Sequence, residues 1–188
     1  MNVIFLDIDG VLNGYNRWNV LGWKVVSKLN SLRLRIWYKK FTDPCGIHES
    51  KVKRLAKIIN VTGAKVVMSS SWRHSWWRTP YEEMTDRQKQ LTDLLNKYNI
   101  EIIDITPSLQ NARREDEIIA WLSRHENDIT NFVILDDENS FLRVFWEDAR
   151  FIQTSTVPKG TLIKGLAIED TGLKNKHVRK AIKVLNLI

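Results

Sequence analysis

Short apolar runs alternate with amphipathic segments along most of the 188-residue chain. The apolar runs are rich in β-formers and predict buried strands, whereas apolar residues spaced i, i+3, i+4 and i+7 predict helices that pack on one face. Because strands and helices alternate, the pattern predicts an α/β domain, a doubly wound parallel sheet with helices on both faces. The predicted strands are 2–6, 64–68, 100–105, 131–135 and 151–153, and the predicted helices are 49–60, 86–98, 114–125 and 175–187.

Length and composition favour one domain over residues 1–188. The chain is 43% hydrophobic with a mean hydropathy of −0.31, and it has no repeat or interdomain linker. Its first residues do not resemble a signal peptide, it lacks a run of about 18 apolar residues, and its single Cys45 cannot form an intramolecular disulfide. We therefore expect a cytoplasmic protein without stable membrane association, and the oligomeric state stays open.

The positive charge is concentrated in one segment. Of the formal net charge of +7, all seven excess Lys and Arg lie between Gly14 and Phe41, where there is no Asp or Glu. This segment contains three Trp, and three more lie between Trp72 and Trp77. Basic charge with exposed aromatic rings suits a phosphate-rich, base-bearing partner. Alternatively, residues 20–29 form a basic amphipathic helix that packs on the core or a membrane surface, and the second Trp cluster belongs to the core.

Polar side chains follow the predicted strands, at the sheet edge where ligands of such folds bind. One acidic residue at a strand end is as readily a cap or turn residue, but two acidic pairs on different strands are not easily explained that way. Repelling carboxylates favour a hard cation such as Mg²⁺. The residues are Asp7 and Asp9 after the first strand, Ser69 to Ser71 after the second, Thr106 after the third, and Asp136 to Glu138 after the fourth.

Four segments resemble the motifs of the haloacid dehalogenase (HAD) superfamily of phosphohydrolases. Phe5-Leu6-Asp7-Ile8-Asp9-Gly10-Val11 resembles the first motif, and residues 66–73, with three successive serines, resemble the second. Residues 111–114 correspond to the third motif, and the acidic stretch 133–138 resembles the fourth. The resemblance implies a Rossmann-like HAD core with a small cap-like insertion at about 14–43.

The resemblance also implies a mechanism. Asp7 is the nucleophile that forms an aspartyl-phosphate, and Asp9 is the general acid and base. Mg²⁺ is bound by the carboxylate of Asp7, the backbone carbonyl of Asp9 and the pair Asp136 and Asp137.

The phosphate-binding residues implied by the resemblance are a serine and an arginine. Strand alternation points Ser70 to one side and Ser69 and Ser71 to the other. Ser70 is favoured, with Ser69 and Ser71 as competitors, because similar sequences place a Ser or Thr two residues before the Trp. The cation of the third motif is Arg114 or Arg113, and the alternative for either is a solvated helix start.

The small insertion leaves the site open to a large substrate. The resemblance is nearest to compact HAD domains of nucleic acid repair, such as the phosphatase part of polynucleotide kinase/phosphatases. We therefore expect a phosphatase that acts on a phosphorylated nucleic acid end or nucleotide, with Arg17, Trp72 and Arg73 as substrate contacts. The alternatives are a small-metabolite phosphatase and a non-catalytic nucleic-acid-binding module, and retention of both Asp7 and Asp9 favours an enzyme.

Overall fold

A computed structural model describes residues 1–13, 46–137, 143–145, 148–154 and 171–187 of the chain. The expected insertion at 14–43, with Arg17, and Glu138 lie outside these residues. All described strands are parallel, and their order is β3-β2-β1-β4-β5. The strands are β1 (Asn2–Leu6), β2 (Lys65–Met68), β3 (Ile102–Ile105), β4 (Asn131–Asp136) and β5 (Phe151–Gln153).

The strand order reverses between β1 and β4. From β1 the chain moves outward to β2 and β3, then returns to the other side of β1 for β4 and β5. Leu6 is in register with Met68 on β2 and with Leu135 on β4, so the three central strands end at the same level. Ligands of parallel α/β sheets bind at such a reversal, beyond the carboxyl ends of the strands.

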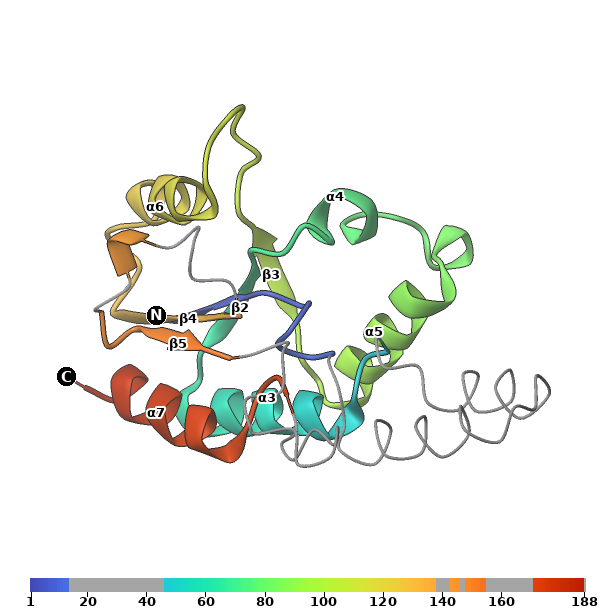
Figure 1. The fold of residues 1–188 in the computed structure, drawn as a ribbon, viewed down its shortest axis with the longest axis horizontal. Coiled ribbons are helices and arrows are strands. Elements are labelled where there is room, and N and C mark those ends of the chain that lie inside the picture. The colour runs from blue at the N-terminus through green and yellow to red at the C-terminus, as the bar shows by residue number, and fades with distance from the viewer. Residues whose placement is uncertain (14–45, 138–142, 146–147, 155–170, 188) are drawn as a thin grey trace, which may run out of the picture.

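Helices cover both faces of the sheet (Figure 1). The helices α3 (Glu49–Thr62), α5 (Asp86–Lys97) and α7 (Asn175–Leu185) pack on one face. The helix α6 (Arg114–Arg124) packs on the other face, together with the short 3-10 helix η2 (Arg143–Phe145). This arrangement confirms the predicted fold class.

Alternating residues of β1 supply both halves of the core. Ile4 and Leu6 face the α3 side, and Val3 and Phe5 face the α6 side. The Phe5 ring meets Trp121 of α6 edge to face, with centroids 5.3 Å apart. Because both faces are buried, the central strands are apolar throughout rather than alternating with polar residues.

Most of the predicted elements are present with small differences in their bounds. The helix predicted to begin at Glu49 extends to Thr62 and ends at Gly63, whose φ of 64° is in the left-handed region. In that helix Ile58 is fully buried and Ile59 only partly. The four-residue helix α4 (Arg73–Trp76) and the 3-10 helix η1 (Tyr81–Glu83) were not predicted, since one turn has no periodicity to detect. Within the described residues, no helix is long and apolar enough to cross a membrane.

A buried histidine near the start of α7 has a pKa well below its ordinary value. His177 is 8% exposed, and its Nδ1 accepts a hydrogen bond from the backbone N–H of Lys174 at 3.1 Å. Burial, with the nearby charges of Lys176 and Lys174, lowers the pKa of His177 to about 4. Protonation therefore breaks the capping contact and places a charge among cations.

We expect the free energy of unfolding of wild type to decrease relative to that of His177→Gln as pH falls from about 6.5 to about 4, while the raised pKa of Asp7 acts in the opposite direction in both proteins. In this window the unfolded chain binds a proton at His177 and the folded chain does not, so acid favours unfolding by up to about 3 kcal/mol. Below about pH 4 both states are protonated and this effect is constant. Urea unfolding across this range checks it. In His177→Gln the side-chain oxygen can still accept the capping hydrogen bond, and acid should lower its free energy of unfolding less than that of wild type. The same pH dependence in both proteins would contradict this account.

Candidate active site

The segment after β1 places Asp7 at the carboxyl edge of the sheet. The backbone N–H of Asp7 donates to the Leu135 carbonyl at 2.9 Å, so the pairing with β4 continues one residue past the strand. The chain then turns, and the N–H groups of Val11, Leu12 and Asn13 all point to the carbonyl of Ile8. The Asp7 side chain is only 3% exposed. This turn fixes a buried carboxylate at the point where the strand order reverses.

The turn requires glycine at its sharpest point. Gly10 has a φ of 72°, which disfavours other residues, and a Cβ there would lie 2.3 Å from the carboxyl carbon of Asp137 and 2.6 Å from its Cβ. The first and fourth motifs therefore approach each other too closely for any side chain at position 10.

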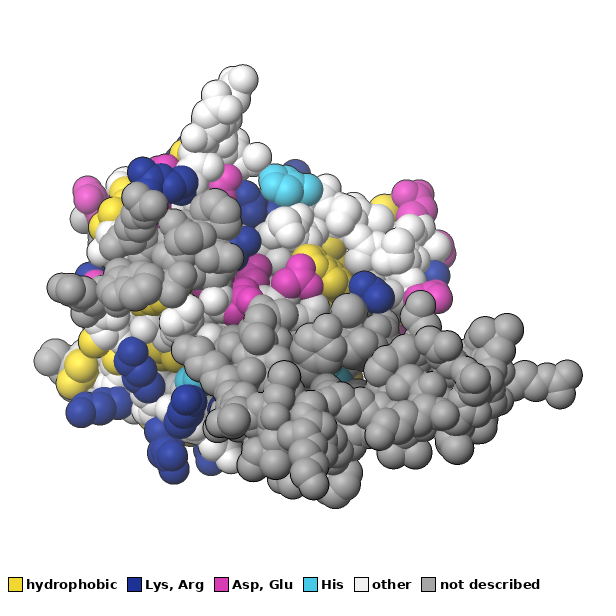
Figure 2. Space-filling view, viewed as in Figure 1, with side chains coloured by type: hydrophobic (Ala, Val, Ile, Leu, Met, Phe, Trp, Pro, Cys, Tyr) yellow, Lys and Arg dark blue, Asp and Glu magenta, His cyan; other side chains and the backbone are white. Residues whose placement is uncertain are grey.

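Three carboxylates meet at this edge. One oxygen each of Asp7, Asp136 and Asp137 lies within 4.8 Å of the others. Asp136 is the last residue of β4 and is fully buried. They converge because β1 and β4 are parallel neighbours in register, so that residues after both strands share one edge. Acidic side chains gather at the centre of this face, over the ends of the central strands (Figure 2).

Arg114, the first residue of α6, is the cation of this cluster. Its Nη1 forms an ion pair with Asp136 and lies 3.4 Å from Oδ1 of Asp7. Burial disfavours its charge, but the carboxylates of Asp136 and Asp7 raise the pKa of Arg114 above its ordinary value. Arg113 instead is exposed and pairs with Glu115 at 3.1 Å. Of the two arginines left open by the sequence, the structure brings Arg114 to Asp7.

One arginine does not balance three carboxylates. Burial, and then the neighbouring charge of Asp136, raise the pKa of Asp7 to about 7, although Arg114 and a hydrogen bond from Ser70 lower it. Among the described residues, the site therefore carries more negative than positive charge, and its acidic groups are all oxygen ligands. This donor set fits a hard divalent metal ion, and Asp7, Asp136 and Asp137 are the residues that would bind it.

The three serines after β2 have different surroundings. The Ser70 side chain is hydrogen-bonded to Asp7. The Ser69 hydroxyl is buried and has no hydrogen-bond partner among the described residues, and Ser71 is exposed. Of the three serines, the structure therefore brings Ser70 to Asp7.

Asp9 is separate from the three clustered carboxylates. Its side chain is exposed and accepts hydrogen bonds from Nε1–H of Trp72 at 2.9 Å and from Nδ2 of Asn13 at 2.5 Å. Asn13 is itself fixed, because its Oδ1 accepts the Gly10 N–H at 2.7 Å. The Asp9 carboxylate is thus held by two donors in an accessible position, while Asp7 is buried.

The sequence suggested Arg73 as a substrate contact, but the structure places it in the interior. Arg73 is 6% exposed and pairs with Glu117 of α6 at 2.7 Å. It also donates to the carbonyl oxygens of Ser69 and Ser70. Arg73 therefore restrains the serine turn through these two carbonyl groups. Its buried guanidinium is stable there because Glu117 and the carbonyl oxygens accept its hydrogen bonds.

Trp72, the neighbouring residue, lies beside the site. Its ring packs partly against the core, and it lines a cavity of about 390 Å³ next to Asp9. The other described residues of this cavity are Ser71, Ser75, Thr85, Arg87 and Gln88. Trp76 and Trp77 of the second Trp cluster also pack against the core, as the alternative interpretation of this cluster expected.

Several residues that support the site were not identified from the sequence. Thr154 Oγ1 donates to the Gly10 carbonyl at 2.7 Å, and Gln153 Nε2 donates to the Asp137 carbonyl at 3.2 Å. Buried Lys51 donates to the Asn13 carbonyl at 2.6 Å. The polar residues at the end of β5 and directly after it were a detectable signal for Gln153 and Thr154, whereas a helical lysine such as Lys51 carried none.

A parallel α/β sheet with an acidic cluster, a serine and an arginine at its point of reversal is the arrangement that the resemblance to the HAD superfamily implies. The sequence matches, over residues 3–158, the family described as the HAD domain in Swiss Army Knife RNA repair proteins, and the chain belongs to this family. Membership indicates a phosphatase-type hydrolase function linked to RNA repair, as the resemblance to nucleic-acid-repair domains implied. Searches of curated proteins and of solved structures found no significant match.

We expect Glu117→Ala to reduce the free energy of unfolding by about 3–5 kcal/mol, because it leaves Arg73 buried without its carboxylate. The double variant Arg73→Met/Glu117→Leu should recover much of this loss, since no charge remains buried. Urea unfolding measures all three. Exposed Glu126→Ala is the matched control and should change stability by less than about 0.5 kcal/mol. A Glu117→Ala protein as stable as this control would show that the pair is not structural.

Proposed function

We propose that this protein is a Mg²⁺-dependent phosphatase that acts on a phosphorylated RNA end through an aspartyl-phosphate on Asp7. The observation that carries the proposal is the convergence of Asp7, Asp136 and Asp137 with Arg114 and Ser70 at the strand reversal. The family, a HAD domain in RNA repair proteins, supports the choice of RNA.

In the first step an oxygen of Asp7 attacks phosphorus, and the bond from phosphorus to the leaving oxygen breaks. Asp9 donates a proton to that oxygen, and its exposed position two residues after Asp7 suits contact with a leaving group. The backbone of the turn restrains Asp7, and Ser70 and Arg114 beside it are suited to donating hydrogen bonds to phosphoryl oxygens.

In the second step water attacks the phosphorus of the acyl phosphate. Asp9 accepts a proton from this water, phosphate leaves, and the Asp7 carboxylate is regenerated. A bound Mg²⁺ would supply positive charge that keeps Asp7 ionised and balances the phosphoryl oxygens. The raised pKa of Asp7 supports this requirement, because without added positive charge about half of Asp7 is protonated near neutral pH.

We also propose that the cavity beside Trp72 receives the nucleoside that carries the phosphate. Trp72 contacts Asp9 directly, and Asp9 protonates the leaving oxygen, so the leaving nucleoside lies next to this cavity. The indole ring offers an aromatic surface, and the hydroxyl of Ser71 and the guanidinium of Arg87 offer polar contacts.

The proposed activity is tested by phosphate release from an aryl phosphate and from phosphorylated oligoribonucleotides, with Mg²⁺ and with a chelator. We expect release only with Mg²⁺, and a loss of at least about a thousandfold in Asp7→Asn, which removes the nucleophile but little volume. Asp116→Asn, on the exposed start of α6, is the matched control for a change from Asp to Asn. Metal-independent release, or an Asp7→Asn enzyme as active as wild type, would contradict the mechanism.

The substrate class is tested by comparing RNA with a 3′-phosphate, RNA with a 5′-phosphate, a mononucleotide and a sugar phosphate. Turnover of the sugar phosphate with indifference to the other three would contradict the choice of RNA.

We expect Trp72→Leu to raise KM for a nucleoside phosphate by about 5- to 100-fold, because stacking on an aromatic ring contributes about 1–3 kcal/mol per base. Trp72→Phe keeps a ring but loses the hydrogen bond to Asp9, so it should affect kcat more than KM. Steady-state kinetics with a nucleoside phosphate and with a sugar phosphate separate these effects. An equal rise in KM for both substrates in Trp72→Leu would show that the ring does not bind the base.

A further inference from the structure

The exposed face of α7 carries a stripe of cations. Its members are spaced i, i+3, i+4 and i+7, so they lie along one side of the helix, and α7 contains no acidic residue. Lys and Arg side chains gather on the visible surface over α7 (Figure 2). The stripe consists of Lys176, Arg179, Lys180 and Lys183, all exposed.

Within the described part of the chain, no salt bridge joins this α7 stripe to a carboxylate. The charge of Lys180 contributes to lowering the pKa of Asp148, but the hydrogen bond from Arg150 to that carboxylate has the largest effect. The pKa of His177 is lowered by burial and by surrounding cations, which also indicates a positive environment. The charge of the stripe is therefore available to an external anion.

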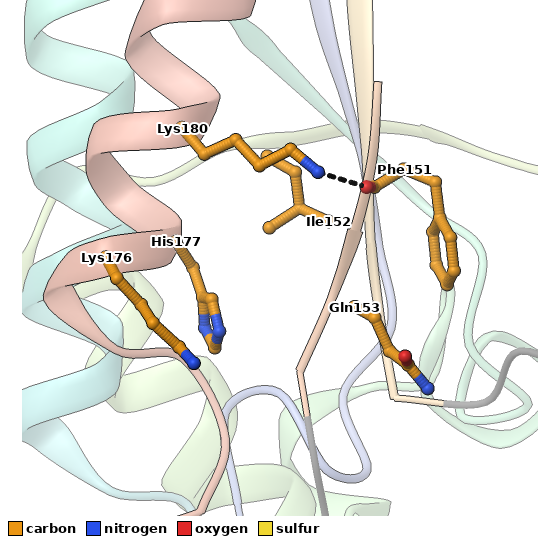
Figure 3. Close-up of a pocket in the computed structure, with 6 residues that line it drawn as sticks. All are labelled: Phe151, Ile152, Gln153, Lys176, His177 and Lys180. Atoms are coloured by element: carbon orange, nitrogen blue, oxygen red, sulfur yellow. Dashed lines mark hydrogen bonds between the residues drawn. The ribbon is translucent and has the colours of Figure 1, made fainter. Parts of the chain in front are cut away.

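A cavity of about 520 Å³ lies between this stripe and β5. In Figure 3, Lys176 and His177 extend from α7 toward the end of the cavity where Gln153 lies, and the ring of Phe151 points away. Lys180 crosses the other end and donates to the Phe151 carbonyl at 3.0 Å. Two ammonium groups and an amide therefore border one hollow, together with Ile152.

The cavity adjoins the candidate active site through the end of β5. Gln153, which lines the cavity, donates to the backbone carbonyl of Asp137, and Thr154 donates to that of Gly10. Asp137 is one of the three clustered carboxylates. The end of β5 thus connects the cavity with the clustered carboxylates among the described residues.

We propose that the α7–β5 cavity and the α7 stripe bind the phosphodiester backbone of the RNA substrate beyond its terminal phosphate. This inference rests on the proposed function, because it assigns a polymeric substrate to the same site. Exposed lysines that form no salt bridge with a described carboxylate, beside a polar hollow, suit the phosphates of an RNA backbone. The eleven residues of α7 extend about 16 Å, enough to contact more than one phosphate.

The test measures binding of a fluorescent, phosphorylated oligoribonucleotide by anisotropy at several salt concentrations, with Asp7→Asn in all proteins to prevent turnover. Lys176→Gln/Lys180→Gln should weaken binding at least about tenfold and reduce the salt slope by about 1.4, if each lysine contacts one phosphate. Lys176→Gln/Lys183→Gln leaves the bond from Lys180 to β5 intact and should act in the same direction. Thermal melting verifies that each variant is folded.

The control is Lys65→Gln/Arg124→Gln, which removes two exposed charges from the opposite edge of the sheet, where β2 starts and α6 ends. It should bind RNA within about twofold of the parent protein, as expected for charges away from the contact. A nucleoside phosphate, which lacks further phosphates, should be bound equally by all variants. RNA affinity unchanged in both α7 variants, or reduced equally in the control, would overturn the inference.

Two further outcomes separate this inference from its alternatives. If the α7 variants lose binding to vesicles of anionic phospholipid while RNA affinity is unchanged, the stripe serves a membrane surface and the inference is wrong. If wild type releases no phosphate from any substrate but the α7 variants still lose RNA affinity, the proposed function fails and this surface stands as an RNA-binding site.

Discussion

The mutual repulsion of buried carboxylates at the ends of two adjacent parallel strands is the constraint on which the site depends. Asp7 and Asp136 are almost fully buried, and Asp136 contributes to raising the pKa of Asp7. Such a pair is unfavourable unless positive charge compensates it. Arg114 supplies part of this charge at the start of α6, and the remainder is what a metal ion would supply. The hydrophobic core makes the arrangement possible, since burial of both sheet faces fixes the strands that carry the acids.

The turn that carries Asp9 depends on parts of the chain far away in sequence. Leu173 donates its N–H to the Val11 carbonyl, and Gly172 approaches this turn so closely that a Cβ would lie 2.8 Å from the same oxygen. Lys51 holds the carbonyl of Asn13, and Asn13 in turn holds Asp9. The family match ends at residue 158, so residues 171–173, which lie beyond it, contribute directly to the order of the site.

The sequence was sufficient for the fold and for the strand-end residues, because parallel strands bring their carboxyl ends to one edge whatever their connections. It could not choose between Arg113 and Arg114, since the direction of a side chain at a helix start depends on where that helix packs. It assigned Arg73 to the substrate because burial is not visible locally, and only its pairing with Glu117 across the fold places it inside. The α7 stripe was also not predicted. Its cations are spaced along a helix and form no continuous run in the sequence, and acidic residues elsewhere offset them in the net charge of the chain.

The central claim is that Asp7 becomes phosphorylated, and trapping that intermediate tests it most directly. In Asp9→Asn protein, an aryl phosphate with a good leaving group needs no acid in the first step, but the second step lacks its base. With Mg²⁺ the account predicts a burst of about one equivalent of phenol, and reduction of the acyl phosphate with borohydride should mark Asp7 in the peptide mass spectrum. No burst, or a mark on a residue other than Asp7, would contradict the account.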